Sequence, residues 1–409
     1  MSGHYFNKKT VRDVPIDGKI VLLRADYNVP LDSSGNIADD YRIVSSLPTL
    51  KYLTEERGCR VVIISHLGRP KGVDASLSLK LVAGRLQKLL NKKVQFVPAC
   101  IGDKVKIATK KMSPGNVILL ENLRFHEQEE ANDEGFAKRL AKDSHASYFV
   151  QDGFGVVHRA HASTSAITQF LPSVGGLLVE REYKSIKGAM LHPKQPLTAV
   201  LGGAKIADKI ELIDKFINKA DQIVIGGAMA NTFLLYKGVN VGKSLVDPDE
   251  KAIIDKIYLD VAKKVGLEKV DDFLYIPTDV AVAEKIDKKQ PRKEVDVHKV
   301  HSDEVILDIG THSIDEIEKR IGTSGTVVWN GTLGYAEILN FAYSSARLAL
   351  HLAKNPDITS IIGGGDTADF VLDWDKQKGK SFSLVSTGGG ASLELMSGKK
   401  LPGVEPLLD

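Results

Sequence analysis

Three glycine-rich segments in the second half of the chain each follow a short apolar run. They are Gly202-Gly203-Ala204-Lys205, Gly363-Gly364-Gly365-Asp366-Thr367 and Gly388-Gly389-Gly390. Glycine lets a ligand approach the backbone closely and leaves N–H groups free to bind phosphate. A helix that starts at such a turn adds a dipole worth ~0.3–1 kcal/mol to a bound anion. One segment alone could be a plain strand-to-helix turn, but three after strands of one predicted sheet favour nucleotide phosphates as the ligand.

Arginines and histidines gather in the first half, mostly at the ends of apolar runs. They are Arg24, Arg42, His66, Arg69, Arg124, His158, Arg159 and His161. Histidines could bind a metal ion, but the arginines among them argue against a metal site, because their positive charge repels a metal cation. The guanidinium fork of donors suits phosphate and carboxylate groups. Separate surface salt bridges explain a single arginine well, but this many beside strand ends favour a shared site for a small anion.

Two better-known phosphate motifs fit the chain poorly. The segment from Gly238 to Ser244 is one residue short of a P-loop, and Lys237 stands at its first glycine position. Gly363-x-Gly365-x-x-Ala368 fits a relaxed dinucleotide fingerprint, but the next predicted strand lacks the acidic residue expected at its end. A nicotinamide-linked dehydrogenase therefore remains only an alternative.

Short apolar runs that alternate with helical patterns must position these residues. The predicted strands are 19–24, 60–65, 94–97, 117–120 and 147–152 in the first half, and 197–201, 222–225, 273–276, 304–307, 326–330, 359–362 and 382–386 in the second. Their continuous rather than alternating apolar character is typical of parallel strands covered on both faces. The sequence thus predicts an α/β, doubly wound parallel fold, formed twice.

Two clusters of helix-breaking residues divide the chain. They lie at 171–176 and 192–196, and between them 177–190 reads as one helix. We expect an N-terminal lobe at 1–175, a connecting helix and linker at 176–196 and a C-terminal lobe at 197–390. The helix is a candidate rigid connector between the lobes.

Composition excludes several classes of protein. The chain has 409 residues, of which 43% are hydrophobic and 26% charged, and its formal net charge is +3. This fits two ordinary globular domains and argues against nucleic-acid binding. No apolar run approaches the ~18–20 residues that span a bilayer, so we expect no membrane partner. The two cysteines form no Cys-x-x-Cys motif, which fits a cytoplasmic protein.

The order of these motifs resembles the phosphoglycerate kinase family over nearly the whole chain. The resemblance runs from Arg24-Ala25-Asp26-Tyr27-Asn28-Val29-Pro30 to Leu401-Pro402-Gly403 and includes Ser65-His66-Leu67-Gly68-Arg69-Pro70, Glu121-Asn122-Leu123-Arg124-Phe125-His126 and the three glycine segments. It implies a monomer with two Rossmann-like lobes joined by an interdomain helix. It also implies a tail, residues 391–409, that returns to the N-terminal lobe.

The resemblance assigns roles to particular residues. Those implied to bind 3-phosphoglycerate or 1,3-bisphosphoglycerate are Asp26, Asn28, Arg42, His66, Leu67, Gly68, Arg69, Arg124 and Arg159. Those implied to bind ADP or ATP are Lys205, Lys209, Glu337, Gly364, Gly365, Asp366 and Thr367, with Asp366 near Mg²⁺. Among the departures from the family pattern, Thr332 replaces a proline, Tyr335-Ala336 replace Val-Phe, and Ile306 replaces a small residue. These bear on nucleotide affinity and base preference.

The resemblance implies reversible phosphoryl transfer from 1,3-bisphosphoglycerate to ADP, which gives 3-phosphoglycerate and ATP. The leaving group, and in reverse the nucleophile, is a carboxylate already ionised at neutral pH, so no general base is needed. Neutralisation of charge on the transferring group is assigned to Arg42, Lys205, Mg²⁺ and the backbone of Gly388, Gly389 and Gly390. Besides the dehydrogenase, a non-enzymatic protein that binds anions or nucleic acid through the arginine cluster stays open as an alternative.

Overall fold

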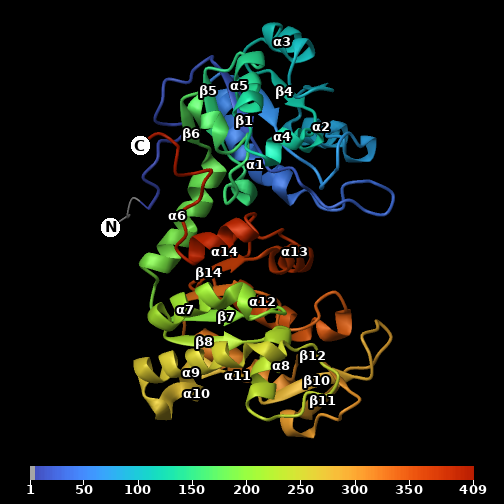
Figure 1. The fold of residues 1–409 in the computed structure, drawn as a ribbon, viewed down its shortest axis with the longest axis vertical. Helices are drawn as coiled ribbons and strands as arrows, with labels where there is room; N and C mark the ends of the chain where they lie inside the picture. The colour runs from blue at the N-terminus through green and yellow to red at the C-terminus, as the bar shows by residue number, and fades with distance from the viewer. Residues whose placement is uncertain (1–4) are drawn as a thin grey trace. The chain divides into compact units, whose positions relative to one another are not determined.

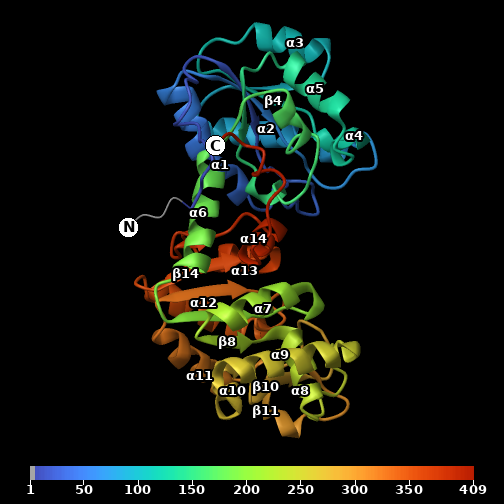
Figure 2. The same ribbon diagram turned by 60° about the vertical axis from the view of Figure 1, so that its left-hand side comes forward.

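The computed structural model describes residues 5–409 (Figures 1 and 2). The first four residues of the predicted N-terminal lobe lie outside this range. The chain forms two compact units, one of residues up to Lys184 together with Gly398–Asp409, and one of Ser185–Ser397. Helix α6, Leu177–Leu191, contains the point at which the chain passes from one unit to the other. No helix within residues 5–409 combines the length and apolar character needed to cross a membrane.

The first unit is built on a six-stranded parallel sheet. Its order is β3-β4-β2-β1-β5-β6. The strands are β1 Ile20–Arg24, β2 Arg60–Ile64, β3 Val94–Val97, β4 Val117–Leu120, β5 Tyr148–Gln151 and β6 Ser173–Gly175. The helices are α1 Tyr41–Lys51, α2 Lys80–Leu90, α3 Asp103–Lys110, α4 Glu127–Glu130 and α5 Glu134–Asp143. Five of the strands lie where the apolar runs predict them, whereas β6 lies inside the predicted cluster of helix breakers.

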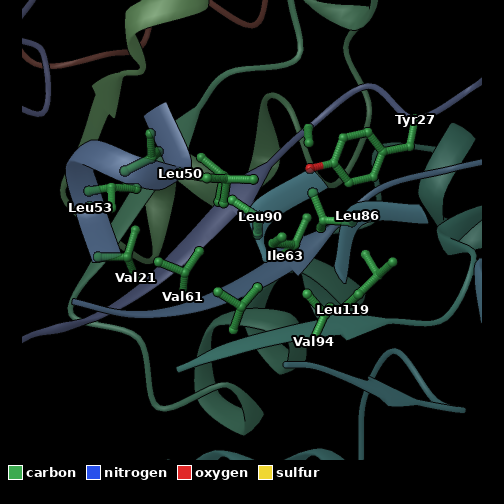
Figure 3. Packing of buried hydrophobic residues seen from close by; sticks show 14 of the residues in the cluster. Val21, Tyr27, Leu50, Leu53, Val61, Ile63, Leu86, Leu90, Val94 and Leu119 are labelled. Carbon is green, nitrogen blue, oxygen red and sulfur yellow. The ribbon is translucent and has the colours of Figure 1, made fainter. Parts of the chain in front are cut away.

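Alternate residues of each strand pack on opposite faces of this sheet. Val21 of β1 joins one apolar cluster with Leu50 of α1 and Leu86 of α2 (Figure 3). Leu22 joins the other with Leu140 of α5 and other residues of α3 and α5. The strands are therefore buried on both sides, which is why their sequences are continuously apolar.

The second unit repeats this architecture. Its parallel sheet has the order β15-β14-β13-β7-β8-β9. The strands are β7 Leu197–Leu201, β8 Gln222–Ile225, β9 Leu274–Tyr275, β13 Thr326–Asn330, β14 Thr359–Gly363 and β15 Leu384–Val385. The helices are α7 Ile210–Lys219, α8 Gly227–Tyr236, α9 Lys251–Val265, α10 Val270–Phe273, α11 Thr311–Gly322, α12 Tyr343–Lys354, α13 Gly365–Trp374 and α14 Gly390–Met396. The predicted fold class, two parallel-sheet α/β lobes, is confirmed.

A small antiparallel sheet in the second unit is absent from the sequence-based prediction. It has the order β11-β10-β12, with β10 Asp279–Ala283, β11 Lys293–Asp296 and β12 Val305–Ile309. The apolar run 304–307 is a strand, as predicted, but it belongs to this sheet and not to the parallel one. Apolar character reveals a buried strand without revealing its neighbours.

The end of the chain pairs with the first unit. Leu408 donates its N–H to the carbonyl oxygen of Ser173 at 2.9 Å and accepts from the N–H of Lys9 at 2.7 Å. Gly403 donates to the carbonyl oxygen of Val157 at 2.8 Å. Helix α14 precedes this segment and belongs to the second unit, which extends to Ser397.

Candidate functional site

The polar residues singled out in the first unit follow the carboxyl ends of its central strands. Asp26 and Asn28 follow β1, His66 to Arg69 follow β2, Arg124 follows β4, and Arg159 follows β5. Because the strands are parallel, these segments meet at one edge of the sheet, which is where open α/β folds bind ligands. Arg42, in the first turn of α1, joins them through an ion pair with Asp26.

Asp26 is a buried acid held in its charged form. Burial alone would raise its pKa, but the charge of Arg42, together with the Asn28 N–H and the charge of Arg24, outweighs that effect and lowers the pKa to about 2. The Asp26 carboxylate also accepts the N–H of Asn28 at 3.1 Å. Asp26 therefore orients Arg42 and the turn after β1.

Side-chain amides fix the loop after β2. Asn28 Oδ1 accepts the N–H of Gly68 at 2.8 Å, and Arg124 donates from Nη1 to the Gly68 carbonyl oxygen at 2.6 Å. Asn122 binds both the N–H and the carbonyl oxygen of Leu67. Gly68 has a φ of +64°, in the left-handed region that favours glycine. Asn122 is absent from the predicted site residues, although it lies inside the motif that carried Arg124.

The arginines of this cluster have few counter-charges. Arg124 lies 3.4 Å from Glu130, whereas Arg69 and Arg159 pair with no carboxylate among residues 5–409. Burial, and then repulsion by Arg159 and Arg69, lowers the pKa of Arg124. Positive groups that repel one another without compensating acids form a site suited to a small anion.

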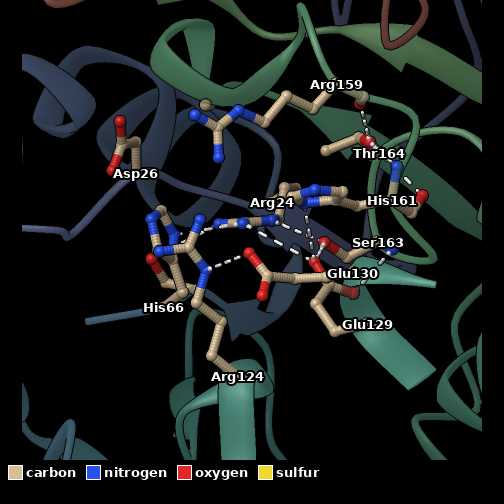
Figure 4. Close-up of polar contacts among 12 residues, drawn as sticks. Arg24, Asp26, His66, Arg124, Glu129, Glu130, Arg159, His161, Ser163 and Thr164 are labelled. Atoms are coloured by element: carbon tan, nitrogen blue, oxygen red, sulfur yellow. Dashed lines mark hydrogen bonds and ion pairs between the residues drawn. The ribbon is translucent and has the colours of Figure 1, made fainter. Parts of the chain in front are cut away.

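The histidines add no charge at neutral pH. Burial, reinforced by neighbouring arginines, lowers the pKa of His158 and of His161 to about 4. His158 Nε2 accepts from Arg159 Nε at 3.2 Å. Figure 4 shows Arg24, Arg124 and Arg159 together with His66 and His161. The arginines alone supply the positive charge of this cluster.

The second unit contains a cavity of about 420 Å³ at the carboxyl ends of its strands. Glu337 and Asp366 of the predicted nucleotide site line it, and so do Ile306, Thr332 and Tyr335, the positions that depart from the family pattern. Its other lining residues are mostly small or apolar, including Gly203, Ala204, Gly227, Ala228, Val280, Val305, Leu333 and Gly334. An apolar cavity with an acid near its rim suits a nucleoside.

The two lysines after β7 differ in orientation. Lys209 Nζ donates to the carbonyl oxygens of Gly202 at 2.6 Å and Asn330 at 2.9 Å. Burial lowers its pKa to about 8, against the opposing charges of Asp366 and Asp208. Lys205 is exposed and pairs with no acid among the described residues. The Lys205 side chain is thus available to bind a ligand, whereas Lys209 binds the backbone of the glycine segment after β7 and the end of β13.

The glycine segment after β14 begins helix α13. Gly364, with a φ of +93°, precedes the helix, and Asp366 lies in its first turn. Thr367 Oγ1 accepts the N–H of Gly331 at 2.7 Å, which joins this turn to the end of β13. Asn330 Nδ2, buried beside Gly364, has no hydrogen-bond partner. Asn330 is the last residue of a predicted strand and is absent from the predicted site residues; its unpartnered donor is the signal that marks it.

The third glycine segment precedes helix α14. Gly389 has a φ of +48°, and its carbonyl oxygen accepts from Ser392 Oγ at 2.7 Å. The N–H of Gly388 donates to Ser386 Oγ at 3.0 Å. Of the three predicted backbone donors, that of Gly388 is therefore already engaged within the protein.

Asp308 is a buried acid in the wall of the cavity that the sequence-based reasoning missed. Burial raises its pKa to about 6, against the opposing charge of Arg292. Arg292 Nη1 lies 2.6 Å from Asp308 Oδ2, and the Ser344 N–H lies 3.1 Å from the same oxygen. Asp308 thereby joins β12 to α12 and fixes one wall of the cavity.

The donor set near Asp366 fits magnesium carried by a nucleotide. Mg²⁺ takes one or two carboxylates together with phosphate oxygens and water, and needs no cage of protein ligands. Within residues 5–409, no group of three or more histidine, cysteine or acidic side chains forms such a cage. A single aspartate in the first turn of α13, beside the cavity, matches the simpler requirement.

Comparison with known proteins identifies the family. Residues 11–399 match the family model described as phosphoglycerate kinase. The chain belongs to the phosphoglycerate kinase family. The phosphoglycerate kinase of Dictyoglomus turgidum is 43% identical over 405 residues, which cover 98% of this chain and 99% of that protein. That of Aquifex aeolicus is 44% identical over 396 residues, covering 97% of each.

Solved phosphoglycerate kinase structures share the fold. The enzyme from Coxiella burnetii superimposes with a TM-score of 0.83 at 35% identity, and that from Pyrococcus horikoshii with 0.81 at 29% identity. Each comparison covers 98% of both chains. The dehydrogenase and non-enzymatic alternatives are therefore not favoured.

Proposed function

We propose that this member of the phosphoglycerate kinase family catalyses the reversible transfer of a phosphoryl group from 1,3-bisphosphoglycerate to MgADP, a step of glycolysis. The P–O bond to the carboxyl oxygen breaks, and a P–O bond to the terminal oxygen of ADP forms. The observation that carries the proposal is a combination of two sites in one chain. One is the cluster of arginines with few acidic partners, and the other is the cavity beside helices that begin at glycine-rich turns.

In the first unit, Arg42, Arg69, Arg124 and Arg159 are proposed to bind the phosphate and carboxylate of phosphoglycerate. Asp26 and Asn28 hold the first turn and the loop at Gly68, while His66 and Leu67 complete that loop. Arginine suits this substrate because its planar fork donates two parallel hydrogen bonds to one anionic group.

In the second unit, the 420 Å³ cavity is proposed to hold the nucleoside, with Glu337 binding the ribose. The nucleotide phosphates then extend to Lys205, Lys209 and the start of α13 at Gly364, Gly365 and Thr367. Bound Mg²⁺, held by Asp366 and phosphate oxygens, would supply further neutralisation of phosphate charge. Ile306, Thr332 and Tyr335 line the cavity, so they are proposed to set base preference.

Catalysis is proposed to rest on positioning and charge neutralisation, as is general for phosphoryl transfer. The carboxylate of 3-phosphoglycerate is ionised at neutral pH and attacks without a base. Arg42, Lys205 and the backbone N–H groups at Gly389 and Gly390 are proposed to stabilise the transferring group. We further propose a cytoplasmic monomer whose two lobes, 1–175 and 197–390, bring the bound substrates in line by hinge motion about the connecting segment 176–196.

The test is formation of ADP from MgATP by the purified protein, with and without 3-phosphoglycerate, in an assay coupled to a dehydrogenase. We expect turnover that depends on both 3-phosphoglycerate and Mg²⁺. Absence of turnover in a folded sample that still binds nucleotide would refute the proposed activity. Replacing ATP by GTP in the same assay measures base preference.

A further inference from the structure

A chain of buried polar groups lies among the substrate arginines. Arg24 is the last residue of β1, Glu129 lies in α4, and Ser163 lies between β5 and β6. All three are buried: Arg24 is 1% exposed, and Glu129 and Ser163 are 0% exposed. Figure 4 shows Arg24 extended between His66 on one side and Ser163 and Glu129 on the other. Burying an arginine and a glutamate costs several kcal/mol per ion unless hydrogen bonds compensate. The donor and the acceptor of each hydrogen bond among these groups therefore need to be identified.

Burial raises the pKa of Glu129, but the charge of Arg24 and the hydrogen bonds from Ser163 oppose this effect. As a carboxylate beside Arg24, Glu129 fixes the direction of its hydrogen bonds. Ser163 Oγ lies 2.5 Å from Glu129 Oε1, and the Ser163 N–H donates to Oε2 at 3.0 Å. A carboxylate only accepts, so the single hydroxyl proton of Ser163 points at Glu129. Ser163 Oγ is then left as an acceptor for Arg24 Nε, at 2.7 Å.

The opposite edge of Arg24 determines the state of His66. Arg24 Nη2 lies 3.2 Å from His66 Nδ1. A guanidinium group cannot accept a hydrogen bond, so His66 Nδ1 must be the acceptor and the ring proton must be on Nε2. Burial, and then the charge of Arg24, lowers the pKa of His66 well below its ordinary value, although Asp26 opposes this.

We propose that Glu129 is a positioning residue that acts through Ser163 and Arg24 to hold His66 as the neutral tautomer with its proton on Nε2, a ready hydrogen-bond donor to the anionic substrate. The inference rests on the proposed function, since it assumes that His66 meets phosphoglycerate. It gives Glu129 a role at a site that it does not itself touch.

Glu129→Gln tests the series of hydrogen bonds from Glu129 through Ser163 and Arg24 to His66, because glutamine has almost the same size and shape as glutamate. If the amide oxygen faces the Ser163 N–H, the amide NH₂ donates to Ser163 Oγ. The hydroxyl proton of Ser163 can then no longer point at residue 129 and is directed toward the Nε–H of Arg24. If the amide is turned over, two N–H groups face each other. Either arrangement places two donors against each other beside Ser163, so we expect Ser163 and Arg24 to shift and the hydrogen bond from Arg24 Nη2 to His66 Nδ1 to weaken.

The first measurement is the ¹⁵N NMR spectrum of the histidine rings in the ligand-free protein, with the His66 signals assigned by loss in His66→Gln. We expect an unprotonated Nδ1 and a protonated Nε2 in the wild type, and a mixture of tautomers in Glu129→Gln. A proton on Nδ1 in the wild type would overturn the proposal. The wild-type result needs no turnover, so it is independent of the proposed activity.

The second measurement is kinetic. We expect Glu129→Gln to raise the KM for 3-phosphoglycerate about tenfold, the size expected for one weakened hydrogen bond to a charged ligand, and to change the KM for MgATP less than twofold. A merely destabilised protein would lose kcat without this selectivity. Equal changes in both KM values would count against the proposal.

Two matched controls and one double variant complete the design. Glu127→Gln removes an exposed acid from the same helix, and Asp143→Asn alters a buried acid elsewhere in the first unit; neither is expected to change the KM for 3-phosphoglycerate. In the His66→Gln background, Glu129→Gln is expected to have almost no further effect, because both act on one donor. Additive effects would show that Glu129 acts elsewhere.

Discussion

Lys209 Nζ donates to the carbonyl oxygen of Gly202, 2.6 Å away. The lysine therefore binds the backbone of the glycine segment that precedes it, and a second bond reaches Asn330 at the end of β13. An ammonium group in this place closes the loop between two neighbouring strands and gives the start of the phosphate site its shape.

Lys209→Met is expected to weaken nucleotide binding. The variant removes one donor from each of two carbonyl oxygens, although that of Asn330 keeps the Gly202 N–H. It also removes a positive charge beside the proposed phosphates, so we expect the KM for MgATP to rise about tenfold. The KM for 3-phosphoglycerate should be unchanged. Lys251→Met, at an exposed lysine of α9, is the control, and an equal effect there would contradict the assignment.

Lys205→Ala is expected to lower turnover at least ~10²-fold, the usual effect of removing one donor to a developing charge. Lys205 is exposed, so thermal unfolding should stay at the wild-type temperature. Steady-state kinetics and a melting curve on the same sample check both statements. Turnover within threefold of the wild type would remove Lys205 from the mechanism.

Arg42→Ala is expected to lose both turnover, at least ~10²-fold, and stability. The buried Asp26 carboxylate would lose its main partner, at a cost of about 2–3 kcal/mol, less than for a fully buried pair because Arg42 is partly exposed. Asp26 has a pKa of about 2 in the folded protein, against 3.8 for an ordinary aspartate.

The stability loss in Arg42→Ala should depend on pH in a defined direction. Because the folded pKa is lowered, the stabilisation is present above about pH 4 and lost as the pH falls through about 2. The difference between wild type and variant should be large at pH 7 and smaller at pH 3, as measured by urea unfolding followed by circular dichroism. Arg42→Lys should restore most of the stability. A pH-independent difference would contradict the role of Asp26.

Asp152 gives the opposite pH dependence at the start of α6. Its Oδ1 accepts the N–H of Leu178 at 3.0 Å, its Oδ2 has no partner, and burial raises its pKa to about 7. A raised carboxyl pKa means that the folded state holds a proton that the unfolded state has released. Stability therefore falls as the pH rises from about 4 to 7.

Asp152→Asn removes this titration. We expect the hydrogen-exchange protection of the wild type at the start of α6 to fall between pH 5 and pH 7, and that of the variant not to follow. The ratio of the variant's protection factor to that of the wild type should therefore increase over this range. The full effect is on the order of 4 kcal/mol. Parallel profiles for the two proteins would show that Asp152 does not titrate in this range.

Direct transfer predicts that both substrates together change the solution shape. Reactants held on separate lobes must meet in line with water excluded. Small-angle scattering should show a smaller radius of gyration with 3-phosphoglycerate and MgADP together, and little change with either one alone. No change with the pair would refute hinge motion.

The parallel strands could be read from the sequence because burial on both faces leaves continuous apolar runs. Strand β11, Lys293–Asp296, could not, because its mainly exposed, charged residues carry no such pattern. The candidate site residues could be predicted from their motifs and from their positions after strands. Their partners were not: Asn122 binds Leu67, 55 positions away, and Glu129 meets Ser163, 34 positions away. Such pairs follow from the folded topology, which local patterns do not encode.

The pairing of the C-terminal segment with β6 makes the first unit discontinuous along the chain. Its last residues are synthesised only after the whole of the second unit, Ser185–Ser397. During synthesis, the first unit therefore lacks the hydrogen bonds of Leu408 with Lys9 and Ser173 until residues 398–409 have left the ribosome. The second unit is continuous in sequence and needs no such delay, so the order of folding in the cell is expected to run opposite to the order in which the two units begin.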